Sequence, residues 1–283
     1  MTKSKYYQIR KVVLSVPLFA FLIALSLMML IPIIWMIVSS FKPDPLIIRY
    51  PPSFFPPMAR LTWNNYINVQ RRIQIFMYVR NSIIYSLGVT IPAMAINSMA
   101  GYAFARYKFP GRNVIFMLLL ATMMVPFQVI MVPTFLIIHS IGWYNTFAGL
   151  LIPRFAGAYW TFLLRAAFSS LPGELEEAAR IDGLSEFGIY SRIMLPQIWP
   201  TMVTMFILCV NGNWNDLIWP LIMTASPNMR TLANGLAMFV GANTIEYGAA
   251  FAGATISLIP MLLMYIFGQR YFVEGQITSG IKG

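Results

Sequence analysis

Residues 173–196 read GELEEAARIDGLSEFGIYSRIMLP and form the most acidic stretch of the sequence. Five of the nine acidic residues of the chain lie in it, between two long apolar runs. Glu-Ala-Ala at 177–179, Gly183 and Ile-x-Leu-Pro at 193–196 are spaced along it as a pattern. Residues 171–197, here named the acidic loop, therefore divide an otherwise apolar and basic chain.

The composition is that of a membrane protein. Hydrophobic residues make up 58% of the 283 residues and charged residues only 10%, with a mean hydropathy of +0.68. Soluble globular domains carry about a quarter charged residues, so we expect an integral membrane protein that contacts lipid. The net charge of +11 fits basic loops that face anionic headgroups, and we do not expect a nucleic-acid partner.

The apolar residues are arranged in segments that suit membrane-spanning helices. Residues 113–153 carry no charge and are about twice as long as the roughly 20 residues that one span needs, so the chain must fold back within them. The turn is predicted at 139–145, where Gly142 stands next to Trp143 and Tyr144, residue types typical of loops and membrane interfaces. Six spans result, at 12–40, 81–105, 113 to the turn, 147–169, 198–221 and 247–269.

Six spans place both termini on the same side of the membrane. With the N-terminus inside, twelve basic residues face the cytoplasm and seven face outward, which favours this orientation. We therefore expect a cytoplasmic N-terminus at 1–11, a transmembrane domain at 12–275 and a cytoplasmic tail at 276–283. Between the first two spans, six prolines in the first half of residues 42–80 argue against a long helix there.

The sequence lacks the residues that catalysis would need. Lys3-Ser4 is the only Lys-Ser or Lys-Thr pair, and no glycine precedes it, so the chain has no phosphate-binding P-loop. A single histidine, His139, and a single cysteine, Cys209, exclude sites that require two of either. We predict a transporter or channel subunit that is not an enzyme and holds neither metal nor cofactor.

The acidic loop carries the signals of a helix–turn–helix segment. Pro172 suits the first turn of a helix, and three glutamates follow in that turn, where the helix dipole favours negative charge. Arg180 stands four residues after Glu176, the spacing of a helical ion pair. Gly183 is predicted to end this helix, and a second helix is expected over 185–194.

These residues alone leave two interpretations of the acidic loop open. It is either a self-capped connector between two spans or a docking element for a partner. In the second case the small side chains of Ala178 and Ala179 let the partner approach the helix backbone, and Glu177 offers a charge to a basic partner.

The spacing of the acidic loop resembles a known signature. Glu177-Ala178-Ala179, Gly183 and Ile193-x-Leu195-Pro196 resemble the EAA signature of permease subunits of bacterial ABC importers. Other segments resemble the second permease of maltose-type carbohydrate systems, namely Asn81-Ser82, Tyr102-Ala103-Phe104-Ala105-Arg106, Trp214-Asn215-Asp216 with Pro220, and Tyr271-Phe272-Val273-Glu274-Gly275. The resemblance implies an all-α type I ABC importer permease fold with six transmembrane helices and cytoplasmic termini.

The same resemblance implies partners for the chain. They are a homologous second permease, a cytoplasmic ABC ATPase dimer that binds ATP and Mg, and an extracytoplasmic solute-binding protein, in a bacterial plasma or inner membrane. The solute would be a sugar, an oligosaccharide or a related polyol. Coupling to the ATPase is assigned to Glu177, Ala178, Ala179, Gly183, Ile193, Leu195 and Pro196, and a second contact in the C-terminal tail to Ser279, Gly280 and Lys282.

Polar residues in the fifth span are candidates for the solute pathway, because polar groups at membrane depth are costly unless they serve a function. These are Asn211, Asn213, Asn215 and Asp216, and Asn97 and Tyr102 of the second span are further candidates. For all of them the alternative is bonding or packing between helices.

Two other functions remain alternatives. One is an ATP-independent secondary transporter or channel subunit, which would need ionisable residues deep in several spans. Asp216 is the only acid in the predicted spans. The other is an ABC permease for a non-carbohydrate solute.

Overall fold

The computed structural model is helical, and it describes residues 3–241 and 245–280, with the side chains of 16–241 and 245–269. Within these residues the only extended pairing is an isolated antiparallel bridge between Val240 and Ile245. The chain forms two compact units. The first comprises Met1–Arg72 and Phe239–Ile256, and the second comprises Ile73–Met238 and Ser257–Gly283.

The first unit is built around the end of a long helix and a proline-rich loop. Its elements are α1 (Lys3–Ser39), α2 (Asp44–Ile47), η1 (Met58–Arg60), α3 (Asn64–Ile73) and the beginning of α15 (Tyr247–Gly280). Between α1 and α3 only the two short helices interrupt the loop, which confirms the prediction made from its prolines.

The fully buried Lys42 side chain donates to the Ser53 carbonyl oxygen at 2.6 Å and lies 4.0 Å from the Trp35 ring centre. These contacts compensate a charge that would be costly to bury alone.

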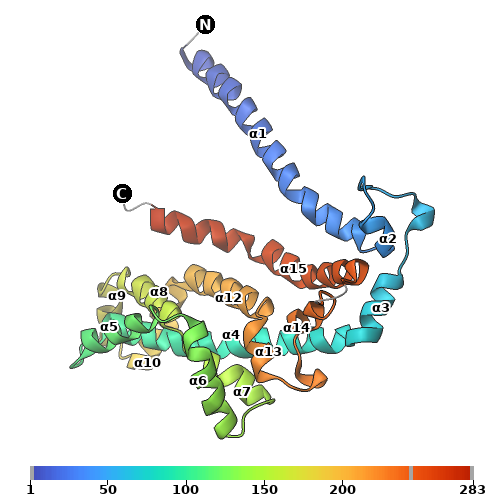
Figure 1. Ribbon diagram of the computed structural model, residues 1–283. Helices are drawn as coiled ribbons and strands as arrows, with labels where there is room; N and C mark the ends of the chain where they lie inside the picture. Colours follow the sequence, from blue (N-terminus) through green and yellow to red (C-terminus); the bar gives the residue numbers. More distant parts are fainter. Residues whose placement is uncertain (1–2, 242–244, 281–283) are drawn as a thin grey trace. The chain divides into compact units, whose positions relative to one another are not determined.

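The second unit contains the acidic loop and most of the predicted spans. Its elements up to the loop are α4 (Ile75–Arg106), α5 (Arg112–Thr122), α6 (Phe127–Ser140), α7 (Phe147–Leu151), η2 (Ile152–Arg154) and α8 (Ala158–Ser169). The loop forms α9 (Glu174–Ile181), α10 (Glu186–Gly188), the π-helix η3 (Ile189–Met194) and α11 (Leu195–Gln197). The remaining elements are α12 (Trp199–Trp214), α13 (Ile218–Met223), η4 (Pro227–Met229), α14 (Leu232–Ala237) and the rest of α15. Helix α4 packs against both α8 and α12 (Figure 1).

A buried asparagine joins α4 to the start of α8. Asn97 Nδ2 donates to the carbonyl oxygens of Ala93 at 2.6 Å and Phe155 at 2.9 Å. Its Oδ1 accepts the Gly157 amide and the Thr161 hydroxyl, each at 2.9 Å. Asn97 is 1% exposed, and its bonds are those of the alternative interpretation, in which it joins helices.

By length and composition, the described residues allow three spans, or up to six if each of three bent helix pairs counts as one span. Three helical segments are long and apolar enough to cross a membrane, namely Val16–Ser39, Ile75–Arg106 and Tyr247–Gln269. Three bent pairs pass the same test together, namely Arg112–Thr122 with Phe127–Ser140 (99°), Phe147–Arg154 with Ala158–Ser169 (41°), and Glu186–Gln197 with Trp199–Trp214 (79°). The predicted spans are therefore less continuous than expected.

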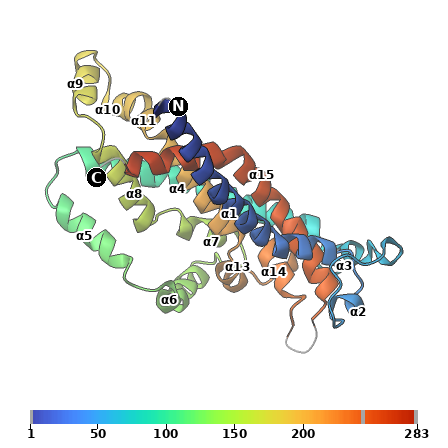
Figure 2. The same cartoon turned by 90° about the horizontal axis from the view of Figure 1, so that it is seen from above.

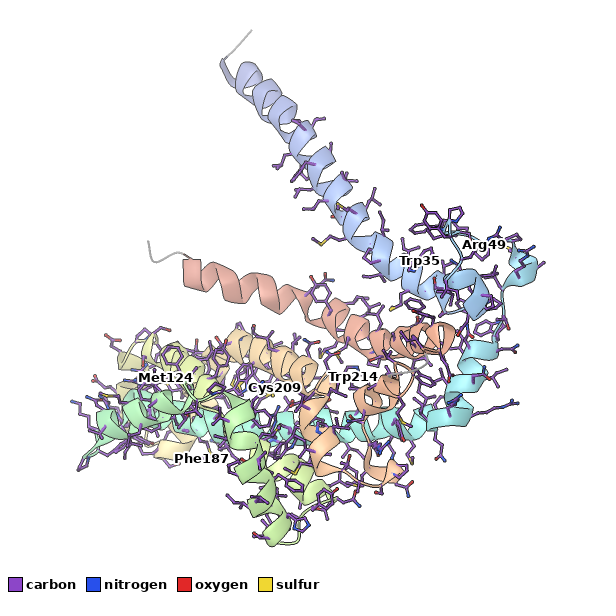
Figure 3. All side chains as sticks on the ribbon, in the orientation of Figure 1. Trp35, Arg49, Met124, Phe187, Cys209 and Trp214 are labelled. Carbon is purple, nitrogen blue, oxygen red and sulfur yellow. The ribbon has the colours of Figure 1, made fainter. Side chains whose placement is uncertain are left out.

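The third predicted span is bent where proline interrupts it. Helix α5 ends at Thr122 and α6 begins after Pro126, because proline disfavours a helical residue before it. Figure 2 shows α5 and α6 running in different directions, and Figure 3 marks the exposed Met124 at the bend. The turn predicted at 139–145 is confirmed, since Gly142 and Asn145 both have positive φ angles (73° and 56°).

The prediction of a continuous fifth span over 198–221 is wrong after Trp214. Helix α12 ends at Trp214, and a separate helix, α13, starts at Ile218. The reason is Asp216, whose Oδ1 accepts the Trp219 amide at 3.3 Å. A side chain that binds a following backbone amide favours a break and a new helix start.

Close packing of α4 on α8 generates a prediction for Gly101. A Cβ atom at this position would lie 2.9 Å from both the Arg165 amide nitrogen and Leu164 Cβ. Gly101→Ala should therefore lower stability by about 1–3 kcal/mol through overpacking. Gly212→Ala in α12 is the matched control, because no atom lies within 4 Å of its added Cβ, and it should gain about 0.5–1 kcal/mol. Thermal unfolding of the purified variants in detergent checks both; equal shifts would contradict the close approach.

Candidate functional site

The first helix of the acidic loop ends in a defined turn. Gly183 has φ +79°, a conformation that glycine adopts without strain. Its amide donates to the Arg180 carbonyl oxygen at 3.0 Å, and the Leu184 amide donates to that of Ala179 at 3.0 Å. This pair of bonds is the Schellman motif, so the predicted stop at Gly183 is confirmed.

The second helix anchors the loop to α4. Ser185 caps its start by accepting the Gly188 amide at 3.2 Å, and the helical run then continues through α10, η3 and α11 to Gln197. Ile189 and Met194 are fully buried, and the Tyr190 hydroxyl lies 2.7 Å from the Ser98 hydroxyl of α4. The second helix predicted over 185–194 is thus confirmed.

The predicted ion pair between Glu176 and Arg180 is wrong. Arg180 instead forms a two-pronged contact with Glu186, at 2.9 and 3.2 Å, and this hydrogen bonding lowers the pKa of the exposed Glu186 carboxyl. Glu176 points inward and is 7% exposed. Its Oε1 lies 3.6 Å from Nε of Arg106, the last residue of α4.

Arg106 holds the acidic loop to two membrane helices at once. Its Nη2 donates to the carbonyl oxygens of Phe168 at 2.7 Å and Leu171 at 2.6 Å, where α8 ends and where a cation is favoured by the helix dipole. Nε of the same side chain faces Glu176. Arg106 therefore joins the end of α4, the end of α8 and the start of α9.

Tyr102, one turn earlier on α4, belongs to the same packed region. It is 3% exposed, and its ring contacts those of Tyr107, Phe168 and Tyr190 at centroid distances of 5.2 to 5.5 Å. Tyr102 is thus a core residue of the loop attachment, as the packing alternative predicted.

The residues predicted to couple the loop to an ATPase divide into exposed and buried sets. Glu177, Ala178, Gly183 and Pro196 are exposed, Ile193 and Leu195 are half-buried against the core, and Ala179 is 4% exposed. The small size of Ala179 therefore serves packing beneath the helix.

The exposed side of α9 includes a residue that the sequence pattern did not single out. Glu177, Ala178 and Ile181 share one helix face by their spacing, and all three are exposed, Ile181 by 87%. We call these three residues the docking face. Phe187 on α10 is 68% exposed (Figure 3). The sequence contains a signal for both: Ile181 lies between two charged residues, and Phe187 follows Glu186 in the same polar loop.

The structure separates the four polar residues predicted for the solute pathway. Asn211 and Asn215 are exposed and bond to each other, with Asn215 Nδ2 3.1 Å from Asn211 Oδ1. Asn213 is 5% exposed and faces a pocket. Asp216 Oδ2 accepts the Tyr85 hydroxyl at 2.8 Å and pairs with Arg154 Nη2 at 3.1 Å.

The pocket that Asn213 faces has a volume of about 310 Å³ and is contributed by α4, α6, η2, α8, α12 and α13. We call it the Arg154 pocket. Its lining includes three aromatic and three polar side chains, namely Phe127, Trp160, Trp219, Thr134, Arg154 and Asn213. Cys209, marked on α12 in Figure 3, also lines it. Among the described residues, no group of histidine, cysteine and carboxylate side chains can hold a metal ion.

The predicted tail contact lies at the margin of the structure. Ser279 and Gly280 are the last residues of α15, and their side-chain surroundings are not described. Lys282 lies outside the described residues. The tail contact therefore stays a prediction.

Comparison with known proteins gives a consistent set of relatives. The family described as "Binding-protein-dependent transport system inner membrane component" matches residues 93–275. The arabinooligosaccharides transport system permease protein AraQ of Halalkalibacterium halodurans is 34% identical, covering 89% of this chain and 91% of AraQ. The trehalose/maltose transport system permease protein MalG of Thermococcus litoralis is 33% identical, covering 92% of this chain and 94% of MalG. A chain of a bacterial ABC transporter that imports the acidic polysaccharide alginate shares the fold, with a TM-score of 0.77, 23% identity, and coverage of 96% of this chain and 99% of that one.

The attachment of the acidic loop can be tested at Arg106. Arg106→Gln leaves Glu176 buried without its cation and two helix-end carbonyls without their donor, so stability should fall by about 3 kcal/mol. Arg180→Gln is the matched control, because it removes an exposed ion pair of the same loop and should leave the unfolding temperature unchanged. Thermal unfolding in detergent is the measurement. An Arg106→Gln protein as stable as the control would contradict the role of Arg106 in joining the loop to α4 and α8.

Proposed function

The chain belongs to the family of binding-protein-dependent transport system inner membrane components, and we propose that it is one of two permease subunits of an importer for a sugar, an oligosaccharide or a related polyol. This membership confirms the predicted resemblance to ABC importer permeases. The chain is thus a transport subunit and not the ATP-hydrolysing enzyme. The observation that carries the proposal is the acidic loop, hydrogen-bonded to α4 and α8 and with an exposed docking face, in a sequence that has no P-loop of its own.

The carbohydrate part of the proposal is supported by several relatives. AraQ and MalG are named as permeases for saccharides, and each aligns with about nine-tenths of this chain. The Trp214-Asn215-Asp216 segment and the tail resemble the same systems. A permease for a non-carbohydrate solute fits these similarities less well.

We assign energy coupling to the docking face and the residues beside it. Glu177 contacts a basic group of the ATPase, Ala178 allows close approach, and Ile181 provides apolar contact area. Gly183 allows the tight turn that ends α9 directly after these residues. When the ATPase dimer closes, it displaces the loop. This displacement reaches α4 and α8 through the hydrogen bonds of Arg106 and through the one between Ser98 and Tyr190.

The permease assignment also accounts for the ionisable residues of the spans. An ATP-independent transporter needs groups in several spans that bind and release a coupling ion. Within the described helices long or paired enough to span, outside the acidic loop, no Asp or Glu occurs. Asp216, between α12 and α13, is held by Arg154 and Tyr85.

The proposal includes the membrane arrangement and the partners. The chain lies in a bacterial plasma or inner membrane with residues 1–11 and 276–283 in the cytoplasm, beside a homologous permease. The ATPase dimer binds ATP and Mg on the cytoplasmic side, and the binding protein delivers solute from outside. Ser279, Gly280 and Lys282 make a second contact to the ATPase.

Uptake measurements test the proposed function. The four-component system, reconstituted into proteoliposomes, should accumulate a radiolabelled saccharide only when ATP is inside and the binding protein outside. Arabinotriose, maltotriose and a trimeric uronate from alginate serve as probes. Uptake that persists without ATP, or a system that imports amino acids in place of saccharides, would contradict the proposal.

The coupling assignment predicts the effect of charge reversal at Glu177. Glu177→Lys should leave assembly intact but reduce ATP-driven uptake at least about tenfold, since a charge-assisted contact contributes about 1.5–3 kcal/mol. Glu174→Lys is the control, because it reverses an exposed charge of the same helix outside the signature and should keep most uptake. If both variants lose uptake equally, the specific role of Glu177 is refuted.

The tail assignment predicts the effect of a short deletion. Removing residues 278–283 should lower the amount of ATPase that co-purifies with the permease, while membrane insertion stays normal. Quantitative immunoblotting of the purified complex measures the ratio. Recovery of the ATPase at the parental ratio would argue that the tail makes no contact.

A further inference from the structure

We infer that the Arg154 pocket holds a neutral glycosyl unit of the transported solute, an inference that rests on the proposed function. The pocket of about 310 Å³ lies between six helical elements of the second unit, and its size falls at the lower end of small-ligand sites. Such a volume suits one sugar ring of a longer chain.

The apolar part of the pocket is a rigid aromatic wall. The Trp219 indole Nε1 donates to the Leu150 carbonyl oxygen at 2.9 Å, and its ring meets the edge of Phe127 with centroids 5.9 Å apart. Trp160 lies over Gly157, where an added Cβ would come within 2.9 Å of its ring. Trp219 is only 1% exposed and supports Phe127. The half-buried rings of Phe127 and Trp160, fixed before any ligand arrives, offer flat surfaces to the C–H faces of a sugar at little entropic cost.

The polar part of the pocket keeps hydrogen-bonding capacity free. The only described hydrogen-bond partner of the Arg154 side chain is Asp216, through Nη2, and its guanidinium carbon lies 5.8 Å from the Phe127 ring centre. No described residue accepts a hydrogen bond from its Nε or Nη1. No described residue donates to Asn213 Oδ1, although its Nδ2 lies 3.5 Å from Thr90 Oγ1. A sugar hydroxyl both donates and accepts, so a polyol can satisfy the guanidinium and the amide oxygen together.

The charge of the pocket favours a neutral ligand. Arg154 is the only charged residue in its lining, and its charge is compensated by Asp216 at 3.1 Å. The Asp216 side chain is 14% exposed and also accepts the Tyr85 hydroxyl, so it is fixed beside the guanidinium. A uronate carboxylate on Arg154 would lie close to that of Asp216, and like charges at this distance repel strongly away from bulk water. The pocket therefore differs in its expected ligand from the alginate importer that shares its fold.

A cysteine reporter tests whether the sugar enters the pocket. Cys209 is the single cysteine of the chain. In a Cys209→Ser chain, the thiol introduced by Thr134→Cys is therefore the only one, and it lies on the wall of the pocket. Ile137→Cys is the matched control, since it lies on the same helix, is 61% exposed and does not line the pocket. Alkylation by N-ethylmaleimide is followed by mass spectrometry of this chain in the reconstituted complex, with arabinotriose, maltotriose or the trimeric uronate.

The expected result is protection by a neutral trimer at one position only. At about ten times its dissociation constant, the bound sugar should slow alkylation of Thr134→Cys about tenfold and leave Ile137→Cys unchanged. Protection by the uronate equal to or better than that by both neutral trimers would overturn the neutral assignment while leaving carbohydrate import standing. Absence of protection by a trimer that the complex imports would overturn the inference that the pocket binds a glycosyl unit. A complex that imports amino acids in place of the three saccharides contradicts the proposed function and the inference with it.

A second variant separates ligand contact from coupling. Trp160→Ala should raise the KM for uptake of the neutral trimer about three- to tenfold while binding-protein-stimulated ATP hydrolysis stays within twofold of wild type. Trp199→Ala, which removes an exposed indole outside the pocket, should leave both unchanged. An unaltered KM in Trp160→Ala would overturn the inference.

Discussion

Helix α4 carries polar side chains along its whole length, and their hydrogen bonds determine how the second unit is assembled. In a bilayer no water is present to satisfy such groups, so each must find a partner within the protein. Along α4 these partners come from different segments: Asn81 bonds to the carbonyl oxygens of Asn228 and Arg230, Tyr85 to Asp216, Asn97 to the start of α8, Ser98 to Tyr190, and Arg106 to the end of α8. The position of each segment is therefore fixed by one helix.

This arrangement connects the two candidate sites of the molecule. At one end of α4, Arg106 and Ser98 hold the acidic loop with its docking face. Farther along the same helix, Tyr85 bonds to Asp216, which is the partner of Arg154 in the pocket. A displacement of the loop thus reaches the pocket through one packed helix, and no separate relay is needed. The close approach of α4 to α8 at Gly101 joins a second helix to the same body.

The local features of the acidic loop were predictable because they depend on neighbouring residues. Gly183 as a helix stop and the start of the second helix follow from short-range capping chemistry. The partner of Glu176 was not predictable in this way, because i, i+4 spacing considers one helix alone, whereas Arg106 is 70 positions away in sequence. The family resemblance likewise rested on spacing within one loop and on short motifs, and it needed no knowledge of the packing.

The pathway residues show the same limit. Asn211, Asn213 and Asn215 alternate in sequence, but a helix turns by about 100° per residue, so Asn213 lies on the face opposite to the one that Asn211 and Asn215 share. Asn213 points into the pocket, and the other two bond to each other at the surface. Trp160 and Arg154 were not predicted as pathway residues, because tryptophan and arginine near a span end usually mark the membrane interface. Their role depends on the break between η2 and α8, which only the folded structure reveals.

The central claim is that the acidic loop and α4 move as one body when the ATPase closes. Spin labels at Glu174→Cys on α9 and Met99→Cys on α4, both exposed positions, in a Cys209→Ser chain give the most direct test. Pulsed electron paramagnetic resonance would measure the distance between them in the assembled complex, without nucleotide and with ATP trapped. The account predicts the same distance distribution in both states. A shift of several ångströms between the states would contradict it, because the loop would then move independently of the helix that carries the pocket.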